Sequence, residues 1–142
     1  MNRQIFVNLP VKDLERSKAF FSALGFANNP QFTNADAACM VVSDTIYLML
    51  LTEPFFKGFT PKAISDAKHS TEVLLCLSCD SREAVDEMAN KARAAGGSWP
   101  NPPKDHGFMY QHGFEDPDGH MWELVYMESV PAQQAESADA SI

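Results

Sequence analysis

The sequence lacks the features of a disulfide-linked or membrane-spanning protein. Its 142 residues include only three cysteines, Cys39, Cys76 and Cys79, and this odd, sparse set argues against a secreted disulfide framework. No apolar run approaches the roughly 18 residues that a membrane helix needs. The first residues lead directly into a strand pattern, unlike a signal peptide. We therefore predict a cytoplasmic protein without a membrane partner.

Positive charge is also scarce, especially in the second half of the chain. The formal net charge is -8, divided into about +1 over residues 1–71 and -9 over residues 72–142. Such a chain repels phosphate backbones, and no basic patch with interleaved aromatic residues is present. Nucleic acid is therefore not a predicted partner.

The pattern that is present repeats once along the chain. Residues 5–9 and 73–77 are short apolar runs typical of strands, and each precedes a helical stripe that ends at a glycine, Gly25 or Gly96. Asp13 and Asp80 stand where helix N-caps are expected. Further strands are predicted over residues 38–42, 45–51, 108–115 and 121–127, with a weaker one near Phe32. Each half thus predicts a strand, a helix and then several strands.

The repeat divides the chain into four parts. We predict a first module over residues 1–53, a connecting loop or lid over 54–71, a second module over 72–129 and a disordered tail over 130–142. The connection contains Phe55, Phe56 and Phe59, which should cover another surface because exposed phenylalanines are costly.

Two sequence motifs link this repeat to a known family. Val11-Lys12-Asp13-Leu14-Glu15-Arg16-Ser17 and Phe114-Glu115-Asp116-Pro117-Asp118-Gly119-His120-Met121-Trp122-Glu123-Leu124 resemble sequences of the vicinal oxygen chelate superfamily. This superfamily includes glyoxalase I, the bleomycin and fosfomycin resistance proteins and the extradiol dioxygenases. The chain looks like the branch labelled predicted lactoylglutathione lyase. The resemblance implies an α+β fold of two βαβββ modules with curved mixed sheets that enclose a cavity, usually completed in a homodimer.

In the metal-using members of this superfamily, the first and last strand of each module supply one metal ligand each. The resemblance places these four positions at Phe6, Met49 (or Leu48 by a one-residue slip), Leu74 and Glu123. Only Glu123 matches a family ligand, and about three protein ligands are needed to hold a catalytic ion. We therefore predict no metal and no other cofactor. A rearranged site of Glu72, Glu123 and a nearby histidine is an alternative.

The candidate site follows from these positions. Glu123, flanked by apolar neighbours, is the candidate catalytic group, because a buried carboxylate can act as a general base. The candidate ligand-binding residues are Phe6, Asn8, Tyr47, Met49, Leu74, Tyr110 and His112. Tyr110 and His112 share one strand face, which either lines the cavity or faces solvent.

These residues favour a protein that binds a small molecule in an apolar cavity without a catalytic metal. The alternative is a metal-dependent lyase or isomerase resembling lactoylglutathione lyase, with the rearranged metal site. The sequence leaves open whether the protein catalyses a reaction.

Overall fold

The computed structural model describes residues 2–128, which form two similar modules joined by a long crossover. The predicted tail over residues 130–142 lies outside this part of the chain. The first module contains β1 (Ile5–Val11), α1 (Leu14–Ala23), β2 (Ala27–Asn29), the 3-10 turn η1 (Pro30–Phe32), β3 (Ala37–Val41) and β4 (Ile46–Thr52). The crossover begins with α2 (Glu53–Lys57). The second module contains β5 (Leu74–Ser78), α3 (Arg82–Ala94), β6 (Lys104–Asp105), β7 (Met109–Glu115) and β8 (Met121–Met127).

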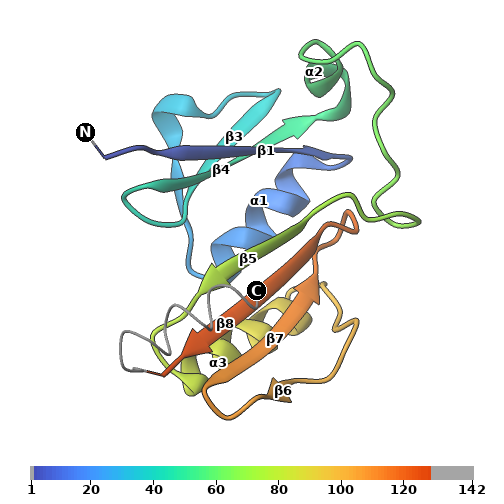
Figure 1. The fold of residues 1–142 in the computed structure, drawn as a ribbon. Coiled ribbons are helices and arrows are strands. Elements are labelled where there is room, and N and C mark those ends of the chain that lie inside the picture. Colours follow the sequence, from blue (N-terminus) through green and yellow to red (C-terminus); the bar gives the residue numbers. More distant parts are fainter. Residues whose placement is uncertain (1, 129–142) are drawn as a thin grey trace.

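Each module has one four-stranded mixed sheet, and the two sheets have the same topology. The strand orders are β1-β4-β3-β2 and β5-β8-β7-β6, with the first strand parallel to the last strand of its module and the other pairs antiparallel. In Figure 1, β5 is the strand of the second sheet nearest to the first module. The predicted α+β fold of two repeated modules is therefore confirmed.

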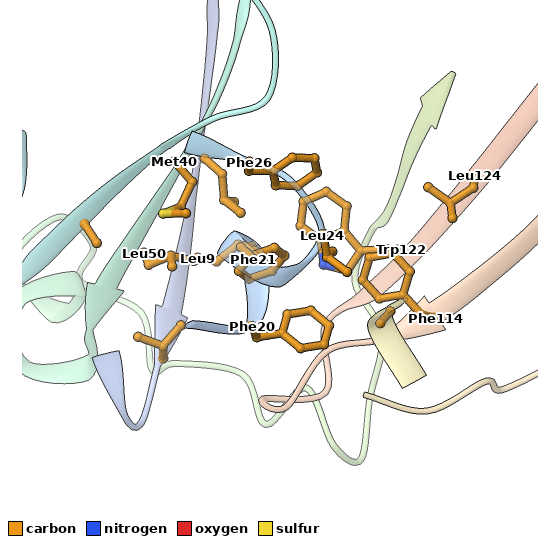
Figure 2. Close-up of a cluster of buried hydrophobic side chains, with 14 of the residues drawn as sticks. Leu9, Phe20, Phe21, Leu24, Phe26, Met40, Leu50, Phe114, Trp122 and Leu124 are labelled. Carbon is orange, nitrogen blue, oxygen red and sulfur yellow. The ribbon is translucent and has the colours of Figure 1, made fainter. Parts of the chain in front are cut away.

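The two modules share a single apolar core, centred on α1. Phe20 and Phe21, each 1% exposed, extend from α1 between the two sheets (Figure 2). The Phe21 ring lies 5.5 Å from Trp122 of β8, and the Phe20 ring lies 5.8 Å from Phe114 of β7. On the other side, Leu9 and Leu50 close the cluster from the first sheet. One face of each sheet is thereby buried against the helices. The opposite face of each sheet is not covered by a helix of residues 2–128 and is called the open face below.

The helix caps agree with the sequence in the first module and differ in the second. The Asp13 carboxylate accepts a hydrogen bond from the Arg16 amide at 3.1 Å, as predicted for the N-cap of α1. In α3 the cap is Ser81, whose hydroxyl accepts from the Ala84 amide at 3.0 Å, so the prediction of Asp80 as N-cap was wrong. Ser81 is one residue closer to the helix than Asp80, and its side-chain oxygen can also accept a hydrogen bond from a first-turn amide.

Two further expectations fail for reasons of packing. The segment near Phe32 forms η1, and the short strand of this region lies earlier, at β2. The crossover phenylalanines do not all cover a surface: Phe59 is 70% exposed and packs edge-on against Phe55, with ring centres 5.2 Å apart. Of the three, only Phe56 lines an internal surface, because α2 places it beside the cavity at the end of β1.

The turn between β7 and β8 joins the second module to the first. Asp118 accepts hydrogen bonds from the Lys12 amide and the Ser17 hydroxyl, both at 2.9 Å, and lies 3.5 Å from the Arg16 guanidinium. Its neighbour His120 bonds the Pro10 carbonyl through Nε2 at 2.8 Å. Asp118 therefore adds a second carboxylate to the first turn of α1, supplied from about a hundred residues away in the sequence.

Replacing this carboxylate should weaken the whole fold. Asp118 has a side chain only 6% exposed, so Asp118→Ala leaves the Lys12 amide and the Ser17 hydroxyl without their charged acceptor. We expect a loss of about 2–3 kcal/mol in the free energy of unfolding, measured by urea denaturation. Asp66→Ala, in an exposed turn of the crossover, is the control and should cost less. Equal losses in the two variants would contradict the joining role of Asp118.

Candidate functional site

The four positions that correspond to metal ligands lie on the sheet faces turned away from the helices. Met49 pairs with Asn8, two residues after Phe6, and Glu123 pairs with Cys76, two residues after Leu74. The register is therefore the same in both modules, which supports the correspondence of the four positions. Alternation along each strand then places Phe6 with Met49 on the open face of the first sheet, and Leu74 with Glu123 on that of the second.

The open face of the first sheet is an exposed aromatic and apolar surface. The rings of Phe6 and Tyr47 stack with centres 4.7 Å apart and an angle of 12° between their planes. The Tyr47 hydroxyl donates to the Asp44 carbonyl at 3.1 Å and accepts from the Gln4 amide at 3.2 Å, which fixes the ring. Phe6 is nevertheless 51% exposed. The structure thus offers an ordered, flat aromatic platform that nothing within residues 2–128 covers.

Asn8 and Met49 extend this platform along the strands. They are register partners, and the Asn8 amide donates to the Phe6 carbonyl at 3.2 Å. Met49 is half-buried, whereas Asn8 is exposed. This places one polar group beside the apolar surface.

On the second sheet, Glu123 is the central polar group of the open face. It is half-buried, and its carboxylate has no hydrogen-bond or ion-pair partner within residues 2–128. Its register partners are Cys76 on β5 and Gly113 on β7. Leu74 lies on the same face and is 56% exposed. Glu123 can therefore accept hydrogen bonds from a ligand without first losing an internal partner.

The thiol beside Glu123 is not an activated nucleophile. Partial burial raises the pKa of Cys76, and the negative charge of Glu123 raises it further. The thiol therefore stays protonated at neutral pH, and it can act as a weak donor toward a ligand.

Two polar residues near Glu123 were not among the predicted site residues. Gln111 of β7 and Lys104 of β6 are register partners, and both line a hollow of about 60 Å³ together with Glu123. Gly113, the residue of β7 opposite Glu123, has no side chain that could cover the carboxylate. Alternation along β7 from Gly113 identifies Gln111, but the two-residue strand that carries Lys104 has no recognisable sequence pattern.

Tyr110 and His112 lie on the opposite face of the second sheet, away from Glu123. The sequence left two options for this face, a cavity wall or a solvent-exposed surface, and the structure shows neither, because α3 covers it. The Tyr110 hydroxyl donates to Asp86 of α3 at 2.6 Å, and this bond, more than burial, raises the pKa of Tyr110 to about 12. The structure therefore does not bring Tyr110 together with the other candidates, whereas His112, although its ring lies on the opposite face, lines the 60 Å³ hollow that Glu123 also lines.

His112 is buried with one ring nitrogen unsatisfied. Its ring packs edge-on against Trp99 at 4.5 Å, its Nδ1 accepts from the Gly113 amide at 2.9 Å, and its Nε2 has no partner within the described part of the chain. The residue is 5% exposed, and burial lowers the pKa of His112, partly opposed by Asp86. The neutral ring is thus the form that the fold stabilises.

This environment predicts a loss of stability in acid. Because the folded-state pKa lies below the unfolded value near 6.5, both states are neutral above that pH and the contribution is constant. As the pH falls below 6.5, the unfolded chain takes up the proton first, so the free energy of unfolding decreases until the folded-state pKa is passed. We expect His112→Phe to flatten this part of a stability-against-pH profile measured by urea denaturation. An unchanged slope in the variant would assign the loss to other groups.

Three cavities lie near these faces, and the largest is not the one at Glu123. A cavity of about 370 Å³ lies between the end of β1, the crossover and the β7–β8 turn, and Asn8 is the only predicted site residue that lines it. One of about 150 Å³ lies between the modules, with Tyr47 and Cys76 in its wall. Phe6, Met49 and Leu74 line none of the three. These three side chains form an open face and not a closed pocket. The register of the sheets, and not a cavity, therefore defines the site.

The residues at the four positions do not fit a catalytic metal. Phe6 and Leu74 have no donor atom, and the thioether of Met49 is a poor ligand for the hard or borderline ions of this chemistry. Within residues 2–128, no group of three or more His, Cys, Asp or Glu side chains is placed to hold an ion. The alternative site of Glu72, Glu123 and a histidine is therefore not assembled within the described part of a single chain.

Among residues 2–128, no helix combines the length and apolar character required to cross a membrane.

Comparisons with known proteins show where this fold also occurs. Residues 3–43 match the family model of the bleomycin resistance protein-like N-terminal region. A hypothetical protein, SA1046 from S. aureus, has a similar structure with a TM-score of 0.75 and 28% identity, over 89% of this chain and 95% of that one. A glyoxalase/bleomycin resistance protein/dioxygenase family enzyme from Burkholderia phytofirmans aligns with a TM-score of 0.71 at 19% identity, over 86% and 96% of the two chains.

A more distant structure extends the comparison to another named activity. Fosfomycin resistance protein FosX from Mesorhizobium loti aligns with a TM-score of 0.66 at 14% identity, over 95% of this chain and 98% of its own. No curated protein has significant similarity to the sequence. The match of the first module and the shared fold of both modules together show that the chain resembles the glyoxalase/bleomycin resistance proteins and has their fold.

Proposed function

We propose that this protein binds a small organic molecule on the open faces of its two sheets, without a catalytic metal. The observation that carries the proposal is the composition of the four positions: three are apolar, and the fourth is the unpaired carboxylate of Glu123. An ordered aromatic surface with one carboxylate suits a ligand that has a flat apolar part and a hydrogen-bond donor. Binding, and not metal-assisted turnover, is the function that these residues support best.

The proposal includes a second copy of the chain that closes the site. Ile5, Phe6, Val73 and Leu74 are each more than half exposed, which is costly for large apolar side chains that cluster on the first strands of the two modules. A symmetric dimer would cover these strands and turn the open faces into a cavity wall. Phe6→Glu combined with Leu74→Glu should then give a monomer in light scattering, whereas a monomeric unmodified protein would contradict this part. The proposed location is the cytoplasm, where the three free cysteines stay reduced.

The binding function is tested by a thermal-shift screen of small organic molecules against the unmodified protein. A true ligand should raise the unfolding midpoint of the unmodified protein, and this shift should be lost in both Phe6→Ser and Glu123→Gln. Glu83→Gln, in the exposed first turn of α3, is the matched control and should keep the shift. Ligands that still bind both site variants would place binding elsewhere. Turnover of methylglyoxal with glutathione that requires a divalent ion and Glu123 would replace the proposal with a lyase.

A further inference from the structure

The 370 Å³ cavity shares Asn8 with the predicted site and is formed by three separate segments. In Figure 1, the crossover runs from α2 to the start of β5, past the end of β1 and the turn between β7 and β8. The cavity lies among these segments. Its volume falls within the range of small-molecule sites, and its lining does not include Glu123, Phe6 or Leu74.

Close backbone packing holds the wall of this cavity in place. A Cβ atom built on Gly119 would lie 2.7 Å from the Lys68 nitrogen and 2.8 Å from the Ala67 carbonyl carbon, so the crossover rests directly on the β7–β8 turn. Gly119 also has a φ of 96°, which favours glycine. On the other side of the turn, His120 is bonded to the Pro10 carbonyl. The crossover therefore packs on the β7–β8 turn, and that turn is itself bonded to the first module.

The lining combines an apolar body with groups that donate hydrogen bonds. Leu9, Phe56, Leu75 and Met121 contribute apolar side chains. Lys62 also lines the cavity, and its ammonium has no ion-pair or hydrogen-bond partner within residues 2–128. The hydroxyls of nearby crossover residues add donors: Thr60 Oγ1 accepts from the Lys62 amide, which leaves its own proton free. Glu72 is the one carboxylate side chain of the lining.

We propose that this cavity is a second binding site, for an amphipathic organic anion whose apolar part fills the cavity and whose anionic group is bound by Lys62. The free ammonium and the neighbouring hydroxyl suit a carboxylate or sulfonate, and Glu72 limits the affinity because it repels the same charge. The site includes Asn8 at the edge of the first open face but none of Phe6, Leu74 and Glu123, and it does not depend on the function proposed for those residues.

The test uses 8-anilinonaphthalene-1-sulfonate, a fluorescent sulfonate with an apolar aromatic body. We expect saturable binding, with backbone amide shifts in NMR spectra concentrated in residues 60–73 and at Gly119. Lys62→Glu should weaken binding up to about fivefold, and Glu72→Gln should strengthen it. Lys57→Glu is the matched control, because this exposed lysine belongs to the same crossover but does not line the cavity, and it should leave binding unchanged.

Two further variants separate this site from the open faces. Phe6→Ser and Glu123→Gln should leave binding of the probe unchanged, even if they abolish binding of the ligands found in the thermal-shift screen. Amide shifts centred on Phe6, Tyr47 and Leu74, equal effects of Lys57→Glu and Lys62→Glu, or fluorescence that does not saturate would each overturn the proposal.

Discussion

Phe21→Ala should leave the protein at the edge of unfolding. Phe21 is 1% exposed and touches aromatic rings from both modules: Phe26 at 6.1 Å, Phe20 at 5.0 Å and Trp122 at 5.5 Å between ring centres. Truncation of a buried phenylalanine costs about 3–5 kcal/mol, through lost burial and the cavity left behind. A domain of this size has only about 5–15 kcal/mol of stability in total. Because Phe21 lies between the two sheets, we expect the loss to affect both modules together.

Urea denaturation followed by tryptophan fluorescence and by circular dichroism measures this effect. Trp122 and Trp99 report on the second module, whereas circular dichroism reports on both. Phe59→Ala is the control, because Phe59 is 70% exposed and should change the stability by less than about 0.5 kcal/mol. Separate transitions for the two signals would show that the modules fold independently. Similar losses in Phe21→Ala and Phe59→Ala would contradict the central packing role of Phe21.

Metal binding should be absent in the unmodified protein and should appear when ligands are restored. We expect elemental analysis after incubation with zinc or nickel to find far less than one ion per chain. Phe6→His, Met49→Glu and Leu74→His together with the native Glu123 would supply four ligands of the type that these ions prefer. The triple variant should then bind about one ion per chain. Phe6 and Leu74 are exposed, so their replacement should cost little stability.

The control for the restored site is the same triple variant with Glu123→Gln. A carboxamide is a weaker ligand than a carboxylate, so affinity for the ion should fall when this fourth ligand is changed. The opposite result is equally informative. If the unmodified protein holds about one ion per chain and loses it in Glu123→Ala, the correspondence of the four positions is wrong and the lyase alternative becomes the better explanation.

The elements of the fold could be predicted because local patterns specify them. Strand alternation and the flanking turn predicted a closing strand over 121–127, and β8 has these bounds. The N-cap of α1 at Asp13 follows from residue type and spacing alone. The N-cap of α3 could not be decided in the same way, because Asp80 and Ser81 are both good capping residues and only the backbone path selects Ser81.

The site was less predictable because it depends on which face of each strand the helices cover. Period-two alternation separates His112 from Gly113 and Glu123, but it does not say which of the two sets lies under α3. The phenylalanines of the crossover show the same limit: their number suggested cover for another surface, yet Phe55 and Phe59 pack mainly on each other. Contacts between distant segments decide both cases, and a single sequence does not encode them in a local pattern.

The contacts of Asp118 bear on what the resemblance to the vicinal oxygen chelate superfamily indicates about activity. The motif from Phe114 to Leu124 carries part of the resemblance, yet its aspartates accept hydrogen bonds from backbone amides, a serine hydroxyl and an indole nitrogen inside the protein. The contacts of Asp118 join the second module to the first, and those of Asp116 hold the turn itself, whatever molecule is bound. The motif therefore predicts how the two modules are joined, and by itself it does not predict an enzymatic activity.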